Sequence, residues 1–550
     1  MAGLGRALAD LGQTTLILWC RPEDSKPQPA RAGIMTHGVA QRNHCYETIA
    51  LAVYQLTSVA IDLGRNWPRS DVISGDTHVN KKLHCLSMLA LAAAAAISLA
   101  SAAGADGPLL VTTGSDGGEG SLRAALEALS KQDAPGQILI VTDGDIEISS
   151  TLTYAGTAPL SIYGKGQTVK TKTDTTLLTL SEGADLTVNS LNFKGPGDFS
   201  IKNRGKAGKG IFIDMRPDQT GVVTLALEDV TVSGVAYHGV HISDCDLADD
   251  CGAGRGGKGG GSPASIVVRL TDVEISDVGN GRFDADGMRV DERSAGDIFF
   301  YAQGSTFTKV GADGVELDEG QEGGVFATAV DSKFDDNGAY CDPKILKAFM
   351  PEKDEGKFED GKTAEADIPG AVKGSPDDAC IEREVELYDS GSVKEYEFGI
   401  DTDDGFDIDE AGPGDLWALI VGSSVHGNLD EGLDFGEEDE GGIKVAVWRT
   451  TAKDNSDDGI KIVESEAGSV EALLHGVAST DNGGKGAVFE QRDAGDLTVV
   501  VDHTKTENND DSDKTGLEVV QDGDGEGTLT LRASEIADGI DAENVNIIEE

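Results

Sequence analysis

The chain has 550 residues, with 98 Asp and Glu against 45 Lys and Arg, and its formal net charge is −53. Charge this negative excludes a nucleic-acid binder, because proteins that bind phosphates need a clustered positive field. The sequence contains one long apolar run, which excludes a multi-span membrane protein. Because 39% of the residues are hydrophobic, the chain can still bury a large core.

The N-terminal part differs in charge from the rest of the chain. Residues 1–78 contain seven basic and seven acidic residues, so the whole negative charge belongs to the remaining 472 residues. A lysine pair, an apolar run from Leu86 to Leu99 and a short segment of small residues then follow, as in a secretory signal peptide. We therefore predict a signal peptide over 79–103, with translation beginning near Val79 and an upstream extension before it that is not part of the native protein. The alternative is an internal membrane anchor after a small cytoplasmic domain.

A repeat dominates the mature chain. A glycine that is followed one and three places later by apolar residues recurs at Gly287, Gly314, Gly405, Gly432, Gly459, Gly486 and Gly516. The steps are 27, 91, 27, 27, 27 and 30 residues, and we interpret the long step as hiding a further unit at Gly338. The alternation predicts a strand after each glycine, with a second strand after the next turn. Strands this short bury their apolar sides only when they are stacked as successive coils.

With these repeats the chain resembles the right-handed parallel β-helix proteins of the pectate-lyase-like superfamily, of the kind exported by bacteria. The resemblance implies an all-β solenoid over 104–550, with coils of about 27 residues. The phrase Gly120-Ser-Leu-Arg is similar to the start of the N-terminal helix in many of these proteins. A helix over Ser121–Ser130 is therefore expected to cap the first coil, where unpaired strand edges would invite aggregation. The alternative folds are a β-sandwich and a propeller.

Two insertions interrupt the repeats, near 245–263 and 341–380, and each contains two of the four cysteines of the mature chain. We predict the disulfides Cys245–Cys251 and Cys341–Cys380, which fit an exported protein. The second disulfide would close a loop of about 40 residues and contribute about 3–4 kcal/mol by loop entropy. Both insertions are expected to leave the coil at the same point and to form one wall of a groove, unless they are surface elaborations without a ligand.

Acidic residues occupy the positions two and four after the repeat glycine, which are predicted to point outward. Equivalent positions of adjacent coils lie about 4.8 Å apart, and like charges at this distance repel by about 1 kcal/mol in water and by more at a drier surface. Bound Ca²⁺ would remove the repulsion, because it takes roughly six to eight oxygen ligands. The candidate ligands are Glu316, Asp318, Asp401, Asp403, Asp407, Asp409 and Asp434. The alternative is a solvated acidic face suited to high salt.

The resemblance also suggests where catalysis would be sought. The β-helix lyases use Ca²⁺ with an Arg or Lys base, and the outward basic residues beside the acids are Arg289 and Lys461. His238 and His241 lie beside the first insertion and are candidate catalytic or metal-binding residues. For all four, a surface position or simple charge balance is the alternative. The Asp pairs of the β-helix hydrolases have no counterpart in the right order, since the Asp-Asp pairs here recur with the repeat, as turn residues do.

Two classes of function remain. The first is an exported, non-catalytic protein of a surface or matrix, or a carbohydrate-binding protein, with calcium as a stabilising ion. The second is a calcium-dependent lyase, or a related glycan-cleaving enzyme, that acts on an acidic polysaccharide. The net charge of −53 repels a polyuronate and favours the first class. We expect a secreted, periplasmic or cell-surface monomer with a polysaccharide as partner, without nucleic acid and without an integral membrane domain in the mature chain. Trp417 and Trp448 are predicted one coil apart, in the core or on a sugar-binding face.

Overall fold

The computed structural model describes residues 107–550, apart from residue 204 and residues 248–250, 252–258, 347–354, 359–360, 370–379, 388–391, 401 and 510–514. The expectations for residues 1–78 and 79–103 and for Asp401 lie outside the described residues.

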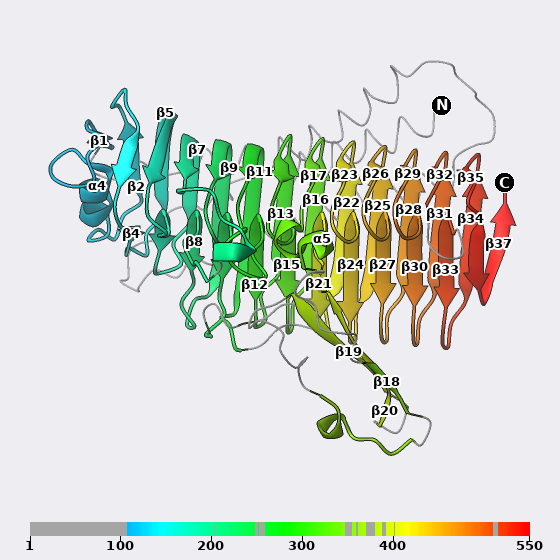
Figure 1. Cartoon of the computed structure of the whole chain (residues 1–550). Helices are drawn as coiled ribbons and strands as arrows, with labels where there is room; N and C mark the ends of the chain where they lie inside the picture. The colour runs from blue at the N-terminus through cyan, green and yellow to red at the C-terminus, as the bar shows by residue number, and fades with distance from the viewer. Residues whose placement is uncertain are drawn as a thin grey trace, which may run out of the picture. The chain divides into compact units, whose positions relative to one another are not determined.

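The described chain folds as a right-handed parallel β-helix, which confirms the fold class (Figure 1). One side of the coil is a ladder of twelve parallel strands, one from each coil. In chain order these strands are β4 (Leu152–Tyr154), β6 (Leu178–Leu180), β8 (Ile211–Asp214), β10 (Val240–Ser243), β12 (Met288–Glu292), β15 (Val315–Glu319), β21 (Phe406–Ala411), β24 (Leu433–Glu438), β27 (Ile460–Glu464), β30 (Ala487–Gln491), β33 (Leu517–Gln521) and β36 (Ile540–Glu543). We call it the twelve-strand ladder.

The rest of the coil is a sheet of twenty-two strands that forms two further ladders. Four long strands belong to both: β5 (Leu160–Thr171), β7 (Leu186–Lys194), β9 (Gly221–Ser233) and β11 (Ala264–Ser276). One ladder also contains β1 (Leu109–Val111), β2 (Gly136–Ile140), β13 (Ile298–Gln303), β16 (Val325–Val330), β22 (Asp415–Val421), β25 (Gly442–Trp448), β28 (Val470–His475), β31 (Leu497–Asp502), β34 (Gly527–Arg532) and β37 (Val545–Glu549). The other contains β3 (Ile146–Ile148), β14 (Thr306–Thr308), β17 (Lys333–Asp335), β23 (Ser424–His426), β26 (Thr451–Lys453), β29 (Ala478–Thr480), β32 (Lys505–Glu507) and β35 (Glu535–Ile536).

The remaining elements lie outside these ladders. Helix α4 (Leu122–Leu129) precedes β2, and the short helix α5 (Pro343–Leu346) follows the second insertion's first cysteine. An antiparallel sheet is formed by β18 (Glu355–Lys357), β20 (Val393–Ile400) and β19 (Ile381–Leu387). Within the described ranges, 3₁₀ turns cover Ile201–Asn203, Ala339–Cys341 and Glu365–Asp367.

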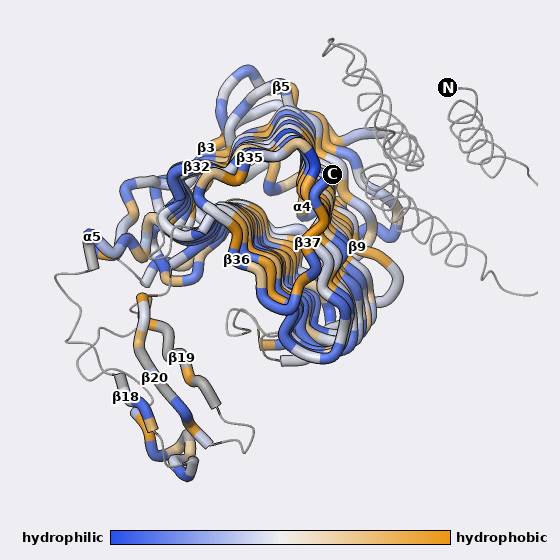
Figure 2. Tube along the Cα trace, turned by 90° about the vertical axis from the view of Figure 1, so that its right-hand side faces the viewer, coloured by the Kyte–Doolittle hydropathy of each residue, from blue (hydrophilic) through white to orange (hydrophobic). Residues whose placement is uncertain are grey.

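The core is a continuous column of apolar side chains inside the coil. In β24, Leu433 and Phe435 are fully buried, and they pair in register with Phe406 and Ile408 of the preceding coil. Figure 2 looks along this stack and shows the coils lying one behind another. The residues one and three places after each repeat glycine therefore form the core, as their alternation predicted.

The repeat glycines are fixed by close stacking of the coils. A Cβ atom on Gly432 would lie 2.6 Å from the carbonyl oxygen of Gly459, and one on Gly314 would lie 2.4 Å from the carbonyl oxygen of Gly405. Real Cβ atoms do not approach an oxygen this closely, so a side chain would force the coils apart. This explains why a glycine directly precedes the strands of the twelve-strand ladder from β8 to β30.

A second column, which the repeat analysis missed, consists of buried asparagines. Asn428 Nδ2 donates a hydrogen bond to Asn455 Oδ1 at 3.0 Å, and Asn455 Nδ2 donates to Asn482 Oδ1 at 3.0 Å. Asn428 and Asn455 also donate to backbone carbonyls, Asn455 to that of Val425 at 3.1 Å, and Asn482 donates to the Ser479 hydroxyl at 3.0 Å. Because buried polar groups need such partners, the column fixes the register from coil to coil.

Helix α4 covers the first coil, as predicted. Ser121 is its N-cap and accepts a hydrogen bond from the backbone N–H of Ala124. Its side chains Leu122, Leu126 and Leu129 are buried in the same core as the strands. The helix thus continues the core at the N-terminal end of the stack.

The two insertions differ in part from the predictions. Both disulfides are confirmed, Cys245–Cys251 and Cys341–Cys380. The interpretation of a hidden unit is wrong, because β15 pairs directly with β21 and the segment at Gly338 forms a 3₁₀ turn instead of a strand. The common exit point is also wrong, since the first insertion follows a strand of the twelve-strand ladder and the second precedes one. The insertions therefore leave from opposite ends of these strands.

Candidate functional site

The outer side of the twelve-strand ladder carries two rows of mostly charged side chains, which we call the acidic face. In coil order the first row is His241, Arg289, Glu316, Asp407, Asp434 and Lys461, and the second is Ser243, Asp291, Asp318 and Asp409. The sequence predicted these side chains to be exposed. Instead, Arg289, Asp291, Glu316 and Asp318 are at most 4% exposed, and the later members of the rows are half-buried.

Arg289 lies at the centre of the buried part of this face. Its guanidinium donates to Asp291 at 2.7 Å, to Asp284 at 3.1 Å and to Asp318 at 3.2 Å, and it also contacts Glu316. Burial raises the pKa of Asp291, but Arg289, His241 and Arg293 together outweigh burial and hold that pKa well below its ordinary value. The acidic neighbours raise the pKa of Arg289 itself far above its ordinary value. Arg289 is therefore a permanent cation.

His238 and His241 join the same network. Lys209 Nζ lies 2.7 Å from His241 Nδ1 and can only donate, so the ring proton is on Nε2, which lies 2.7 Å from Asp291. Burial, aided by Lys209, lowers the pKa of His241 to about 4. Burial also lowers the pKa of His238 well below its ordinary value, and its Nδ1 accepts from the backbone N–H of Asp286. Both rings are thus neutral at pH 7.

Sequence reasoning missed several members of this network. Arg293 is fully buried and donates to both carboxylate oxygens of Asp318, one of them at 2.8 Å. Lys209 and Asp286 were missed as well, because they lie outside the two outward positions of the repeat. The signal for Arg293 was a basic residue directly after the glutamate that ends β12, which among the later coils only Arg492, after Gln491, repeats.

Three groups of acids have carboxylate oxygens within 4.8 Å of one another, the separation that a metal ion needs, and two of them share Asp404: Asp284, Asp286 and Glu316; Asp404, Asp407 and Asp434; and Asp404, Asp430 and Glu431. In the group Asp284, Asp286 and Glu316, the guanidinium of Arg289 already contacts all three carboxylates. A cation is therefore in place, and this group does not fit a further metal ion.

The group Asp404, Asp407 and Asp434 fits a metal ion better. Lys461 binds Asp434 at 2.7 Å and Glu431 at 2.8 Å, but no described basic residue forms an ion pair with Asp404 or Asp407. Burial raises the pKa of both well above the ordinary value, with further contributions from Glu431 and other acidic neighbours. Oxygen ligands at this separation are the donor set that Ca²⁺ prefers.

The other predicted ligands lie close to this group. Asp409 follows Asp318 in the second row, and burial raises its pKa to about 7. Asp403 directly precedes Asp404 and is also buried. Burial raises the pKa of Asp434 to about 6 against the opposing charge of Lys461.

A separate group lies on the outer side of the large sheet. Asp502 accepts from His475 at 2.8 Å and from His503 at 2.6 Å, if each Nδ1 carries the proton. Arg532 is the next residue in the same row of the ladder. Since both oxygens of Asp502 are occupied and a cation stands beside it, this group is a poor metal site.

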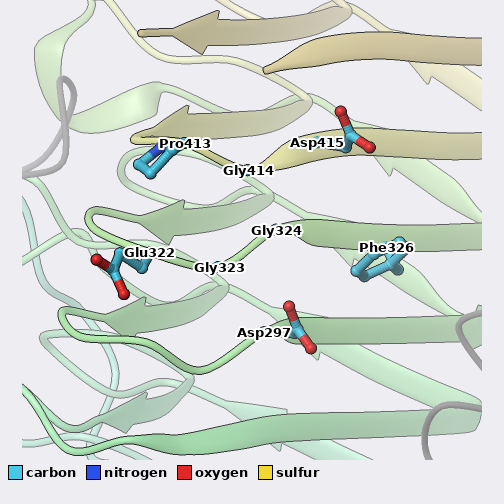
Figure 3. Close-up of a pocket in the computed structure, with 8 residues that line it drawn as sticks. All are labelled: Asp297, Glu322, Gly323, Gly324, Phe326, Pro413, Gly414 and Asp415. Carbon is cyan, nitrogen blue, oxygen red and sulfur yellow. The ribbon is translucent and has the colours of Figure 1, made fainter. Parts of the chain in front are cut away.

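A shallow hollow of about 410 Å³ lies at the corner between the twelve-strand ladder and the large sheet. Figure 3 shows Asp297, Phe326 and Asp415 around it, on three successive coils. Phe326 stacks on Phe299 at 5.0 Å between ring centroids, and Trp417 follows at 6.2 Å. An aromatic row with carboxylates beside it is a surface on which a sugar ring can stack and donate hydrogen bonds.

The two tryptophans do not stack on each other. Trp417 pairs with Lys444 and Trp448 pairs with Val421, so they occupy different rows. Both point to the outer side of their strands, where Trp448 packs with Ala446, not into the coil. This excludes the core of the coil for both tryptophans.

Among the described residues, no helix is long and apolar enough to cross a membrane.

Comparison with known proteins gives fold-level likenesses only. No family model matches the chain, and no curated protein is significantly similar in sequence. Among solved structures, the chain is similar to the ORF18 protein of Geobacillus virus E2, at 10% identity and a TM-score of 0.30, covering 81% of this chain and 64% of that one. It is also similar to the GH136 lacto-N-biosidase of Eubacterium ramulus, at 10% identity and a TM-score of 0.31, covering 80% and 67%.

Proposed function

We propose that the protein is an exported, non-catalytic β-helix protein of a surface or matrix that binds carbohydrate and uses Ca²⁺ to hold its acidic face together. The observation that carries the proposal is the commitment of every candidate catalytic side chain to a structural contact. His238 and His241 are at most 2% exposed, Arg289 is ringed by acids, and Lys461 is held between two carboxylates. The two disulfides favour an extracellular or periplasmic location.

The lyase alternative requires a side chain that takes a proton from the substrate. Such a base must be unprotonated near neutral pH and within reach of the substrate. The acidic neighbours raise the pKa of Lys461 above its ordinary value, as they do for Arg289. Neither basic residue has the character of a general base, so the geometry favours the non-catalytic function.

Calcium would bind at Asp404, Asp407 and Asp434, where acids outnumber the basic residues. There it would supply the positive charge that Arg289 supplies two coils earlier. The test compares thermal melts in CaCl₂ and in NaCl of equal ionic strength, for the wild type, for Asp407→Asn and for the exposed control Asp522→Asn. A site saturated at a hundred times its Kd adds about 2.7 kcal/mol. We expect this gain in the wild type and the control and its loss in Asp407→Asn. Equal melts in both salts would contradict the calcium site.

The hollow beside Phe326 is the proposed carbohydrate site. Because carboxylates line it, we expect neutral oligosaccharides to bind and uronates to be repelled. The assay is a panel of both kinds, measured for binding and for unsaturated products with and without chelator, with Asp415→Asn as the site variant and Asp522→Asn as its control. Product formation from a uronate would overturn the non-catalytic function, and equal binding by the two variants would overturn the site.

A further inference from the structure

A third row of acids lies at the corner where the twelve-strand ladder ends, and nothing in the proposed function uses it. Its members pair in register from coil to coil, and all are at most 1% exposed: Glu292, Glu319, Glu410, Glu437 and Glu464. We call this row the glutamate column. Two further coils continue it with amides, Gln491 and Gln521, which are equally buried.

A short motif in the sequence builds the column. In all seven coils a glycine follows four residues after the Glu or Gln, and the glycine leaves room for the side chain. A Cβ atom on Gly441 would lie 2.3 Å from Glu437 Oε1, and one on Gly414 would lie 2.4 Å from Glu410 Oε1. The motif therefore keeps a carboxyl group inside the corner of every coil, away from water.

The glutamines show which hydrogen bonds the column requires. Gln521 Nε2 donates to Gln491 Oε1 at 2.8 Å, and Gln491 Nε2 donates to Glu464 Oε2 at 2.6 Å. Each side chain thus donates to the one in the preceding coil. A glutamate can make the same link only if it carries a proton, because an ionised carboxylate has no donor.

The glutamates have no other source of positive charge. Within the described part of the chain, no ion pair joins any of the five to Lys, Arg or His. None of the four carboxyl oxygens of Glu410 and Glu437 receives a hydrogen bond from an N–H or O–H group. Backbone N–H groups do serve the other three glutamates: Ser294 donates to Glu292, Gln321 to Glu319 and Glu466 to Glu464. Glu410 and Glu437, in the middle of the column, are therefore the two glutamates whose carboxyl oxygens lack a hydrogen-bond donor.

The surroundings add negative charge. Asp244 faces Glu292, Asp297 faces Glu319, Asp415 faces Glu437 and Asp493 faces Glu464. Arg293 acts on Asp244, but its guanidinium is paired with Asp318. Burial, with these acids and the neighbouring glutamates, raises the pKa of Glu410 to about 11, of Glu292 to about 10 and of Glu437 to about 9.

We propose that the glutamate column is a chain of carboxyl groups that share protons at neutral pH, each protonated group donating to the carboxyl of a neighbouring coil, and that this column makes the β-helix respond to pH. The protons come from solvent when the chain folds, since the glutamates of the unfolded chain are ionised above about pH 4.3. Each native-state pKa is raised above its unfolded value. The stability from these protons is therefore complete at acidic pH and is lost as pH rises toward the native values.

The test replaces one shared proton by a permanent donor. In Glu410→Gln the amide can donate as Gln491 does, without taking up a proton, and Glu471→Gln on the sheet surface is the matched control. Urea denaturation of both and of the wild type is measured from pH 5 to pH 8.5. We expect Glu410→Gln to be more stable than the wild type at pH 8, with a pH dependence reduced by about one proton, and the control to follow the wild type. The proposal would be overturned if Glu410→Gln lost as much stability at pH 5 as at pH 8.5 and kept the pH dependence of the wild type.

A second measurement uses the wild type alone and holds even if the variant folds poorly. Infrared spectra at pH 8 should contain the carbonyl absorption of protonated carboxyl groups, which ionised carboxylates lack. Its absence would overturn the proposal. The column would equally be refuted as a proton chain if CaCl₂ stabilised the wild type at pH 8 and not Glu410→Gln, because a metal ion would then supply the charge.

Discussion

Replacing Arg289 by methionine isolates the energy of the buried part of the acidic face. The substitution keeps the unbranched stem of the side chain, though not its full length, and removes the only cation that touches Glu316 among the described contacts. It also removes the main reason for the low pKa of Asp291, to which His241 and Arg293 would still be near. The acids must then take up protons in the native state or remain charged without a partner.

The size of the effect follows from the free energy of protonating these acids in the native state. An acid with an ordinary pKa near 4 that must stay protonated at pH 7 lowers the free energy of unfolding by about 1.4 kcal/mol per pH unit, or about 4 kcal/mol. This agrees with the roughly 3–5 kcal/mol lost when one partner of a buried ion pair is removed. The pKa of Asp291 is depressed in the wild type, so the stability that Arg289 confers is present above pH 4 and disappears as pH falls. At pH 5 the loss should be about 1–2 kcal/mol.

The assay is urea denaturation of Arg289→Met at pH 5 and pH 7, with two comparisons. Arg289→Lys keeps the charge and loses the forked geometry, so it should fall between the wild type and the methionine variant. Arg492→Met removes a half-exposed arginine from a surface ion pair and should change stability by less than about 1 kcal/mol. A loss for Arg289→Met below about 1 kcal/mol at both pH values would refute the reasoning, as would a larger loss at pH 5 than at pH 7.

Two further substitutions test the columns that hold the coils in register. Gly432→Ala places a Cβ atom 2.6 Å from a carbonyl oxygen of the next coil. It should lower the free energy of unfolding by about 1–3 kcal/mol, measured by urea denaturation. Gly144→Ala is the control and should be neutral, because its Cβ atom meets no atom within 4 Å. Asn455→Ala leaves the neighbouring amides without partners and should cost about 2–5 kcal/mol, against no measurable change for the exposed Asn546→Ala; equal melting temperatures for the two asparagine variants would contradict the column.

The repeat period was enough to predict the coil and its core. The glycines and the apolar residues one and three places later are spaced by the stack itself, so Leu433 and Phe435 could be assigned to the core from the sequence. The capping helix was implied by the resemblance of Gly120-Ser-Leu-Arg to known β-helix proteins, and both disulfides by the two cysteines in each insertion. The 91-residue step misled the analysis, because a period alone does not distinguish an extra coil from a loop inserted into one.

The burial of the acidic face could not be predicted in the same way. Alternation gives the direction of a side chain, and Glu316 and Asp318 do alternate with core residues. It does not tell what lies against that side chain, and their partners Arg289 and Arg293 come from another coil. The glutamate column, by contrast, was visible in the sequence as a Glu or Gln four residues before a glycine in seven coils. The predicted acidic face did not include it, because the glutamates lie outside the two outward positions of the strand.

The two acid systems respond to pH in opposite directions, and this separates their roles. Asp291, paired with a cation, contributes stability that is lost on acidification, whereas Glu410 and Glu437, which hold protons, contribute stability that is lost as pH rises. The protein should therefore be most stable at a mildly acidic pH. If calcium binds at Asp407 as proposed, it adds a cation where acids are in excess, so CaCl₂ should move this maximum to higher pH, and a chelator should move it back. A formal charge of −53 thus overstates the charge of the folded chain, because part of it is neutralised by buried protons.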